Sequence, residues 1–84
     1  MAEKLIGKVT HYFDKISVAA VILGGELKVG DELHIIGHGA DFNQTVDSMQ
    51  IEGKNVVKAK KGDEIGIRIA GKAKPGTEVY LVQE

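Results

Sequence analysis

Hydrophobic and polar residues alternate along much of this sequence, in short segments that end at glycine-containing turns. Alternation with a period of two is typical of a β-strand with one face in a core and the other in water. The pattern predicts such strands over residues 4–13, 32–38 and 64–70. The last is the clearest, because Ile65, Ile67 and Ile69 share one face of it.

The alternation also assigns the side chains of the first two predicted strands to faces. In residues 4–13, one face carries Leu5, Gly7, Val9, His11 and Phe13, and the other carries Lys8, Thr10 and Tyr12. In residues 32–38, Leu33 and Ile35 face away from His34 and Ile36. We expect one face of each strand to lie in the core.

Residues 16–23 are apolar at every position except Ser17, and a pair of glycines ends the run. Its length and its β-branched residues favour a strand over a helix. Because both faces of this segment are apolar, we expect a strand buried on both sides. In the loop that follows, Leu27 and Val29 are expected to pack back onto the core.

Residues 42–51 form a further predicted strand whose apolar positions do not keep one parity. The slip between Val46 and Met49 indicates a β-bulge or a strong bend. With a short strand at 56–59 and a last one at 78–82, the sequence predicts six or seven strands joined by tight turns. We therefore expect an all-β fold, a small antiparallel six- to seven-stranded β-barrel forming a single domain over residues 1–84.

The composition fits one small globular domain and excludes several other classes. The 84 residues are 43% hydrophobic and 27% charged, with no cysteine, so neither disulfides nor a thiolate metal site can stabilise the fold. No apolar run approaches the roughly 18 residues that span a bilayer. The start of the chain lacks the pattern of a secretory signal. We expect a cytoplasmic protein that does not enter a membrane.

Candidate catalytic and cofactor motifs are incomplete. His34 and His38 have the spacing of a helical zinc motif, but on a strand residues four apart lie about 13 Å from each other. The glycines of residues 71–77 have P-loop spacing, yet Thr77 stands where the phosphate-binding lysine would be. Neither Ser17 nor Ser48 lies in a nucleophile elbow. The sequence predicts no enzyme, no cofactor, no metal site and no autonomous GTP binding.

The charge is uneven along the chain, although the formal total is only −1. Residues 54–74 hold seven basic side chains against two acidic ones, which gives +5. Residues 1–53 hold four lysines against eight carboxylates, which gives −4, and Glu78 and Glu84 add −2. If the turns of this basic segment meet, they form a positive surface for phosphates; the alternative is a solvated, lysine-rich surface. The candidate RNA-binding residues are Lys54, Lys58, Lys60, Lys61, Arg68, Lys72 and Lys74.

Two motifs carry a family resemblance. Leu27-Lys28-Val29-Gly30-Asp31 and Ala59-Lys60-Lys61-Gly62-Asp63-Glu64-Ile65-Gly66-Ile67, together with most of the chain between them, resemble the second domain of translational GTPases such as elongation factor Tu. Related barrels also close the chains of collagenase-like peptidase proteins. The resemblance to the translation factors implies a β-barrel of the translation-protein type that holds transfer RNA or docks on the ribosome, without GTP hydrolysis.

Two functions follow as hypotheses. The first is a non-catalytic, translation-related module that binds RNA or a ribonucleoprotein through the lysine-rich segment. The alternative is a protein–protein interaction module that partners an RNA-modifying or peptidase-family enzyme.

Overall fold

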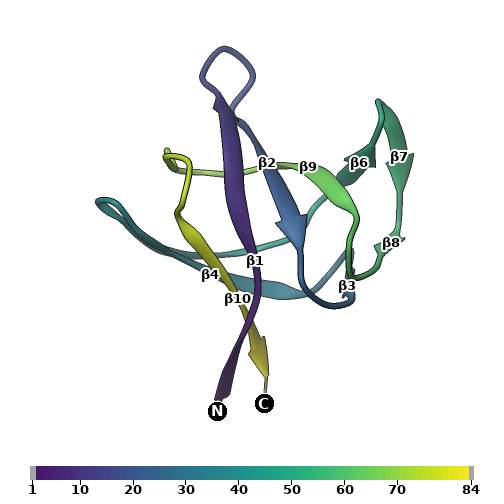
Figure 1. Ribbon diagram of the computed structural model, residues 1–84, viewed down its shortest axis with the longest axis horizontal. Coiled ribbons are helices and arrows are strands. Elements are labelled where there is room, and N and C mark those ends of the chain that lie inside the picture. Colours follow the sequence, from purple (N-terminus) through teal and green to yellow (C-terminus); the bar gives the residue numbers. More distant parts are fainter. Residues whose placement is uncertain (1, 84) are drawn as a thin grey trace.

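A computed structural model describes residues 2–83 (Figure 1). Ten strands are assigned within these residues: β1 Ala2–Phe13, β2 Val18–Leu23, β3 Leu27–Lys28, β4 Glu32–Gly37, β5 Ala40–Thr45, β6 Met49–Ile51, β7 Lys54–Val56, β8 Lys58–Ala59, β9 Glu64–Arg68 and β10 Glu78–Gln83. Eight of them form one sheet in the order β5-β4-β10-β1-β2-β9-β6-β7, and β3 pairs with β8. All pairings are antiparallel, so the predicted all-β antiparallel class is confirmed.

The predicted closed barrel of six or seven strands is wrong. Within residues 2–83 no strand pairing joins β5 to β7, so the eight-stranded sheet stays open between its two end strands. The reason lies after β5, where Val46 bonds back to the turn before β4. Its N–H donates to the Asp31 carbonyl at 2.8 Å, and its carbonyl accepts from Gly30 N–H at 2.9 Å. The next strand, β6, pairs with β9 and β7, so the outer edge of β5 has no strand beside it in the described chain.

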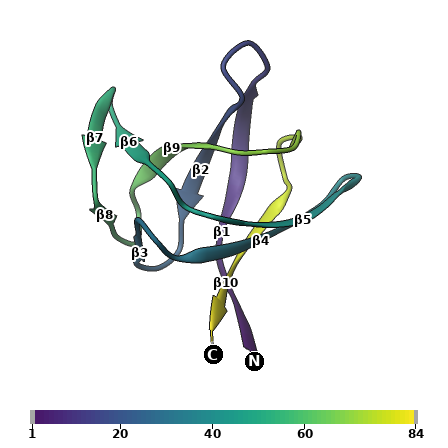
Figure 2. The same ribbon diagram turned by 180° about the vertical axis from the view of Figure 1, so that it is seen from behind.

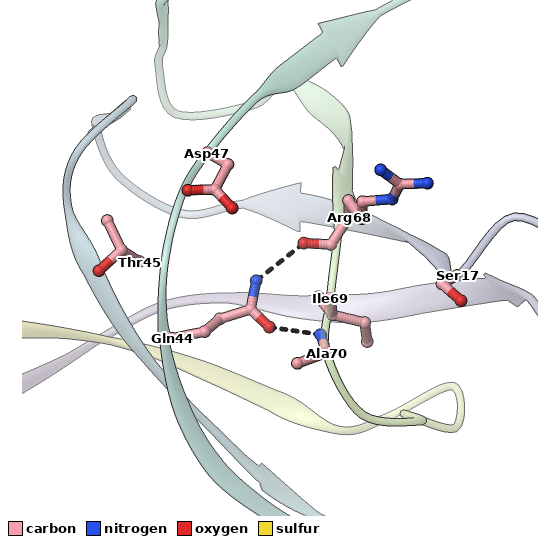
Figure 3. Close-up of a pocket in the computed structure, with 7 residues that line it drawn as sticks. All are labelled: Ser17, Gln44, Thr45, Asp47, Arg68, Ile69 and Ala70. Atoms are coloured by element: carbon pink, nitrogen blue, oxygen red, sulfur yellow. Dashed lines mark hydrogen bonds between the residues drawn. The ribbon is translucent and has the colours of Figure 1, made fainter.

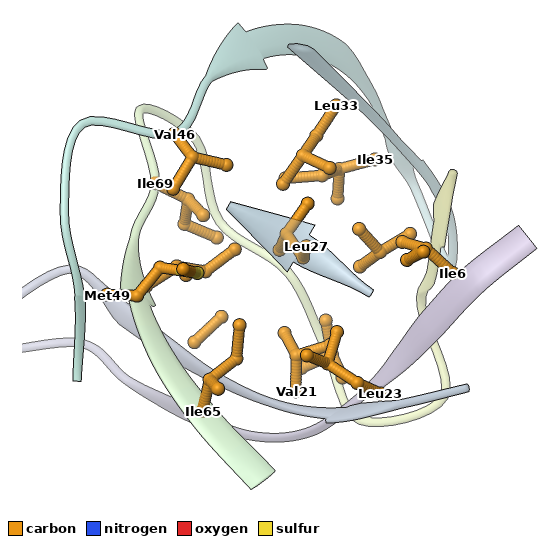
Figure 4. Packing of buried hydrophobic residues seen from close by; sticks show 14 of the residues in the cluster. Ile6, Val21, Leu23, Leu27, Leu33, Ile35, Val46, Met49, Ile65 and Ile69 are labelled. Carbon is orange, nitrogen blue, oxygen red and sulfur yellow. The ribbon is translucent and has the colours of Figure 1, made fainter. Parts of the chain in front are cut away.

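The open sheet curls around a single core (Figures 2 and 4). Leu33 and Ile35 on β4, and Ile65 and Ile67 on β9, are each no more than 2% exposed, as their alternation predicts. The single strand predicted over residues 42–51 is instead two strands, because β5 ends at Thr45 and β6 begins at Met49. The gap between them falls at the phase slip that indicated a β-bulge or a strong bend. The two ends of the described chain lie side by side, since β1 pairs with β10 from Ala2 and Gln83 onward.

The face assignment for β1 is wrong, because two register shifts interrupt this strand. One lies between Leu5 and Gly7 against β10, and the other between Val9 and His11 against β2. Each shift is typical of a bulge, in which one extra residue moves the following side chains to the other face. Leu5 and Phe13 are therefore 44% and 45% exposed, whereas Ile6 is buried.

The prediction that residues 16–23 are buried on both faces is also wrong for this chain. Ala19, Val21 and Leu23 on β2 are buried, but Ile22 is 41% exposed, and Ile16 in the turn before the strand is 57% exposed. One face of β2 packs on the core, whereas on the other face Val18 and Ala20 are half-buried and Ile22 is exposed. In the following loop Leu27 is buried as expected, whereas Val29 is 37% exposed.

No helix that could span a membrane occurs in the described part of the chain.

Candidate functional site

A hollow lies where the sheet is open, between the end of β5 and the segment that follows β9 (Figure 3). Its volume is about 450 Å³. Polar side chains and backbone surround it, and it is lined by Ser17, Gln44, Thr45, Asp47, Arg68, Ile69 and Ala70. It is therefore the first place to look for chemistry that the sequence did not indicate.

Gln44 bridges the open side of the sheet with its side-chain amide (Figure 3). Its Nε2 donates to the Arg68 carbonyl at 2.8 Å, and its Oε1 accepts from the Ala70 N–H at 2.7 Å. These two bonds flank Ile69, as the backbone of a neighbouring strand would. The Gln44 amide thus bonds the Arg68 carbonyl and the Ala70 N–H. In a closed barrel, a neighbouring strand would pair with these two backbone groups.

The other polar groups around the hollow do not form a catalytic arrangement. The lining holds no histidine beside Ser17, and no hydrogen bond joins the Ser17 hydroxyl to another lining residue among residues 2–83. Arg68 and Asp47 stand on opposite sides (Figure 3), and within residues 2–83 no ion pair joins them. The hollow offers hydrogen-bonding groups and a structural bridge.

Replacing Gln44 by alanine is expected to lower the free energy of unfolding by about 1–2 kcal/mol, because two hydrogen bonds of about 1 kcal/mol each are lost. Gln44→Glu keeps the acceptor for Ala70 but turns a second oxygen toward the Arg68 carbonyl at neutral pH. This variant should regain stability as the pH falls and its carboxyl becomes a donor. Urea unfolding at neutral and acidic pH measures both effects, and an unchanged midpoint for Gln44→Ala would contradict the bridging role.

The seven basic residues predicted from the sequence are spread over several elements. Lys54 and Lys58 lie on β7 and β8, and the Lys58 ammonium pairs with Glu26 at 3.4 Å. Lys60 and Lys61 precede β9, Arg68 ends it, and Lys72 and Lys74 lie in the loop that follows (Figure 1).

The two lysine pairs lie at opposite ends of β9. Gly62, next to Lys61, donates its N–H to the carbonyl of Leu23 at the end of β2. The loop of Lys72 and Lys74 instead borders a hollow lined by His11, Tyr12, Asp14, Lys72, Ala73, Lys74 and Pro75, beside β1. The length of β9, about 13 Å at the usual rise per residue, therefore lies between the two lysine pairs.

A charged network not predicted from the sequence is centred on His34. Its Nδ1 lies 2.8 Å from Glu3 Oε1, and its Nε2 lies 2.6 Å from Asp41 Oδ1. The hydrogen bond to Asp41, then that to Glu3, raises the pKa of His34 above its ordinary value. The network joins β1, β4 and β5, so no local motif could have revealed it.

The raised pKa of His34 makes stability depend on pH. Because the folded-state pKa lies above the unfolded value near 6.5, the contribution is fully present below pH 6.5 and is lost as the pH rises through the folded-state pKa. His34→Gln should remove this loss, so that its melting temperature changes less over that range. Thermal unfolding of both proteins from pH 5 upward measures the difference, and parallel curves would contradict the network's role.

No group of three or more histidine, cysteine or acidic residues in the described chain is arranged to hold a metal ion. At His34 the geometry explains this, since its two ring nitrogens already face different carboxylates. The Gln44 amide and the His34 ring therefore contact other parts of the same domain, and these contacts link its strands.

The chain is similar to two curated proteins with protease names. It is 40% identical over 80 residues to an uncharacterized protease of Methanocaldococcus jannaschii, which covers 94% of this chain and 20% of that protein. It is 36% identical over 77 residues to a collagenase of Porphyromonas gingivalis, with 89% and 21% covered. The chain spans about a fifth of the length of these relatives. No protein-family model matches it.

Solved structures show the same fold. The C-terminal domain of a Geobacillus thermoleovorans protein described as a U32 peptidase superposes with a TM-score of 0.89 at 18% identity, covering 95% of this chain and 93% of that one. Its selenomethionine variant gives a TM-score of 0.87 at 19% identity, covering 90% and 96%. At this identity the likeness establishes the fold.

These relatives correct the predicted family and function. The assignment to the second domain of elongation factor Tu-like GTPases, and with it the translation-related, RNA-binding role, is wrong, because the similar sequences and structures belong to protease and U32 peptidase proteins. The alternative hypothesis, which names a peptidase-family enzyme, agrees better with them.

The two motifs that suggested a translation factor are matching turns. In the first, Lys28 N–H donates to Asp31 Oδ2 at 3.0 Å, and Gly30 has a φ of 99°. In the second, Lys60 N–H donates to Asp63 Oδ2 at 3.0 Å. Glycine followed by aspartate builds such a turn in any domain that needs it, so these motifs indicate the fold and not the function.

Proposed function

We propose that this chain is a non-catalytic, protein-binding domain of the kind found at the C-terminal end of U32 peptidase proteins. The observation that carries the proposal is the pattern of coverage: identities of 36–40% extend over almost the whole chain, yet over only a fifth of each relative. The domain would act with a peptidase portion, in the same polypeptide or in a separate one.

The arrangement of polar groups supports an accessory role. The best-placed groups, the Gln44 amide and the His34 ring, are engaged with backbone and carboxylates of the chain itself. Catalysis of peptide hydrolysis needs an activated nucleophile or a metal-bound water. We therefore infer that any hydrolytic chemistry belongs to the peptidase portion.

The proposal is tested by adding the 84-residue chain to the Methanocaldococcus jannaschii relative from which the 80 matched residues have been deleted. Sedimentation velocity should show a one-to-one complex, and circular dichroism confirms that the shortened relative is folded. If the shortened relative does not fold, the same question is put to the intact relative with this chain in place of its matched residues. A domain that tumbles and melts independently there, or no complex with a folded partner, would contradict the proposal.

A further inference from the structure

The outward side of β2 and its preceding turn form an apolar surface, which we call the outer β2 face: Phe13, Ile16, Val18, Ala20 and Ile22. Phe13, Ile16 and Ile22 are 45%, 57% and 41% exposed, and Val18 and Ala20 are half-buried. The register places Phe13 directly opposite Val18, so these side chains are neighbours on one surface. Adjacent exposed apolar residues of this kind mark interaction sites more often than isolated ones.

The sequence of β2 is unusual for a strand with a solvated face. An antiparallel strand with one face in water normally alternates apolar and polar residues, and a continuous apolar run is typical of strands covered on both sides. The neighbouring β9 follows the first rule, with Glu64 and Arg68 at its outward positions. On β2 the outward positions are Val18, Ala20 and Ile22. The composition of β2 fits a strand that another surface covers.

The outer β2 face also has a shape suited to an inserted side chain. Ala20 lies opposite Gly66 on β9, and these two small residues line a hollow of about 260 Å³. Phe13, Ile16, Glu52 and Glu64 are among its other lining residues. One apolar side chain of a partner would fit over the two small residues, and basic groups of the partner would face the two glutamates.

We propose that the outer β2 face docks on the peptidase portion of a U32 peptidase protein, through an apolar side chain seated over Ala20 and Gly66 and basic residues opposite Glu52 and Glu64. This inference rests on the proposed function and names its contact surface. The relatives supply the occupant, since about four-fifths of each lies outside the matched domain. A second copy of this chain fits less well, because the sheet curls around its core and two convex outer faces would touch along a narrow strip.

The test compares variants of the outer β2 face with a matched control. Ile16→Lys and Ile22→Lys place a charge on the face, while Val57→Lys makes the same change at a side chain that is 77% exposed between β7 and β8. Binding to the shortened Methanocaldococcus jannaschii relative is measured by calorimetry. We expect each face variant to bind about tenfold more weakly or worse, and Val57→Lys to bind as the unchanged chain does. Thermal unfolding of each isolated variant verifies that it folds.

The outcomes separate this inference from the proposed function. If the unchanged chain binds and the folded face variants bind equally well, the surface is wrong and the proposed function stands. If the unchanged chain does not bind a folded partner, the proposed function fails first. If the isolated chain sediments as a dimer that Ile22→Lys dissociates, a second copy covers the face and the inference is overturned.

Discussion

Gly7→Ala is expected to destabilise the domain severely. A Cβ at this position would lie 2.5 Å from the backbone oxygen of Ile22 and 2.9 Å from Val21 Cγ1. Backbone cannot move aside as a flexible side chain can, and overpacking of this kind costs about 1–3 kcal/mol or more. A single core in a domain of this size rarely supplies more than about 3–5 kcal/mol. Urea unfolding should therefore show a much lower midpoint or no folded population.

Gly24→Ala is the matched control for this prediction. Gly24 lies at the end of β2, and the nearest atom to an added Cβ is the oxygen of Ile6 at 3.7 Å, an ordinary van der Waals contact. We expect its midpoint to lie close to that of the unchanged protein. Equal midpoints for Gly7→Ala and Gly24→Ala would show that β1 and β2 are not packed as closely as described.

Leu33→Ala should produce the second large loss of stability. Leu33 lies on β4, is 0% exposed, and belongs to the core that the curled sheet encloses (Figure 4). Truncation of such a leucine leaves a cavity and costs about 2–5 kcal/mol. Chemical unfolding monitored by circular dichroism measures the change.

Leu5→Ala removes the same atoms from a side chain that is 44% exposed. Its expected loss is a small fraction of that of Leu33→Ala, because the bulge after Leu5 turns this side chain outward. If the two variants lose equal stability, the bulge is misplaced and Leu5 belongs to the core. The pair therefore tests both the packing and the register of β1.

Local patterns predicted the regular parts of the fold. Ile65, Ile67 and Ile69 alternate because β9 has one core face, and all three are buried. The slip between Val46 and Met49 indicated an irregularity at the right place, although the structure has a gap between β5 and β6 there and not a bulge or bend within one strand. In these segments a single sheet face determines the sequence pattern, so that pattern can be interpreted without knowing the neighbours.

Features that depend on distant neighbours could not be predicted. The bulges of β1 are set by its registers with β10 and β2, and without them Leu5 and Phe13 were assigned to the same face as Val9. The His34 network joins Glu3 on β1, near the start of the sequence, to His34 on β4 and Asp41 on β5, in its middle. The lysine-rich segment is continuous in sequence, but β9 separates its two ends in space.

The expected burial of β2 on both faces shows how a wrong prediction can be informative. The pattern of residues 16–23 indicated two covered faces, and the described chain covers one. Under our proposal the pattern reflects the domain in its docked state. The apolar outward residues of β2 would then be explained by an interface that forms only when the domain binds its partner.

The most direct test of this account is a magnetic resonance titration of the isotope-labelled 84-residue chain with the shortened Methanocaldococcus jannaschii relative. We predict that resonances of residues 13–22 and of Gly66 shift or broaden on binding, while those of the loop between β7 and β8 stay in place. Changes confined to the turns of Lys60 and Lys72, or no changes with a folded partner, would contradict the account.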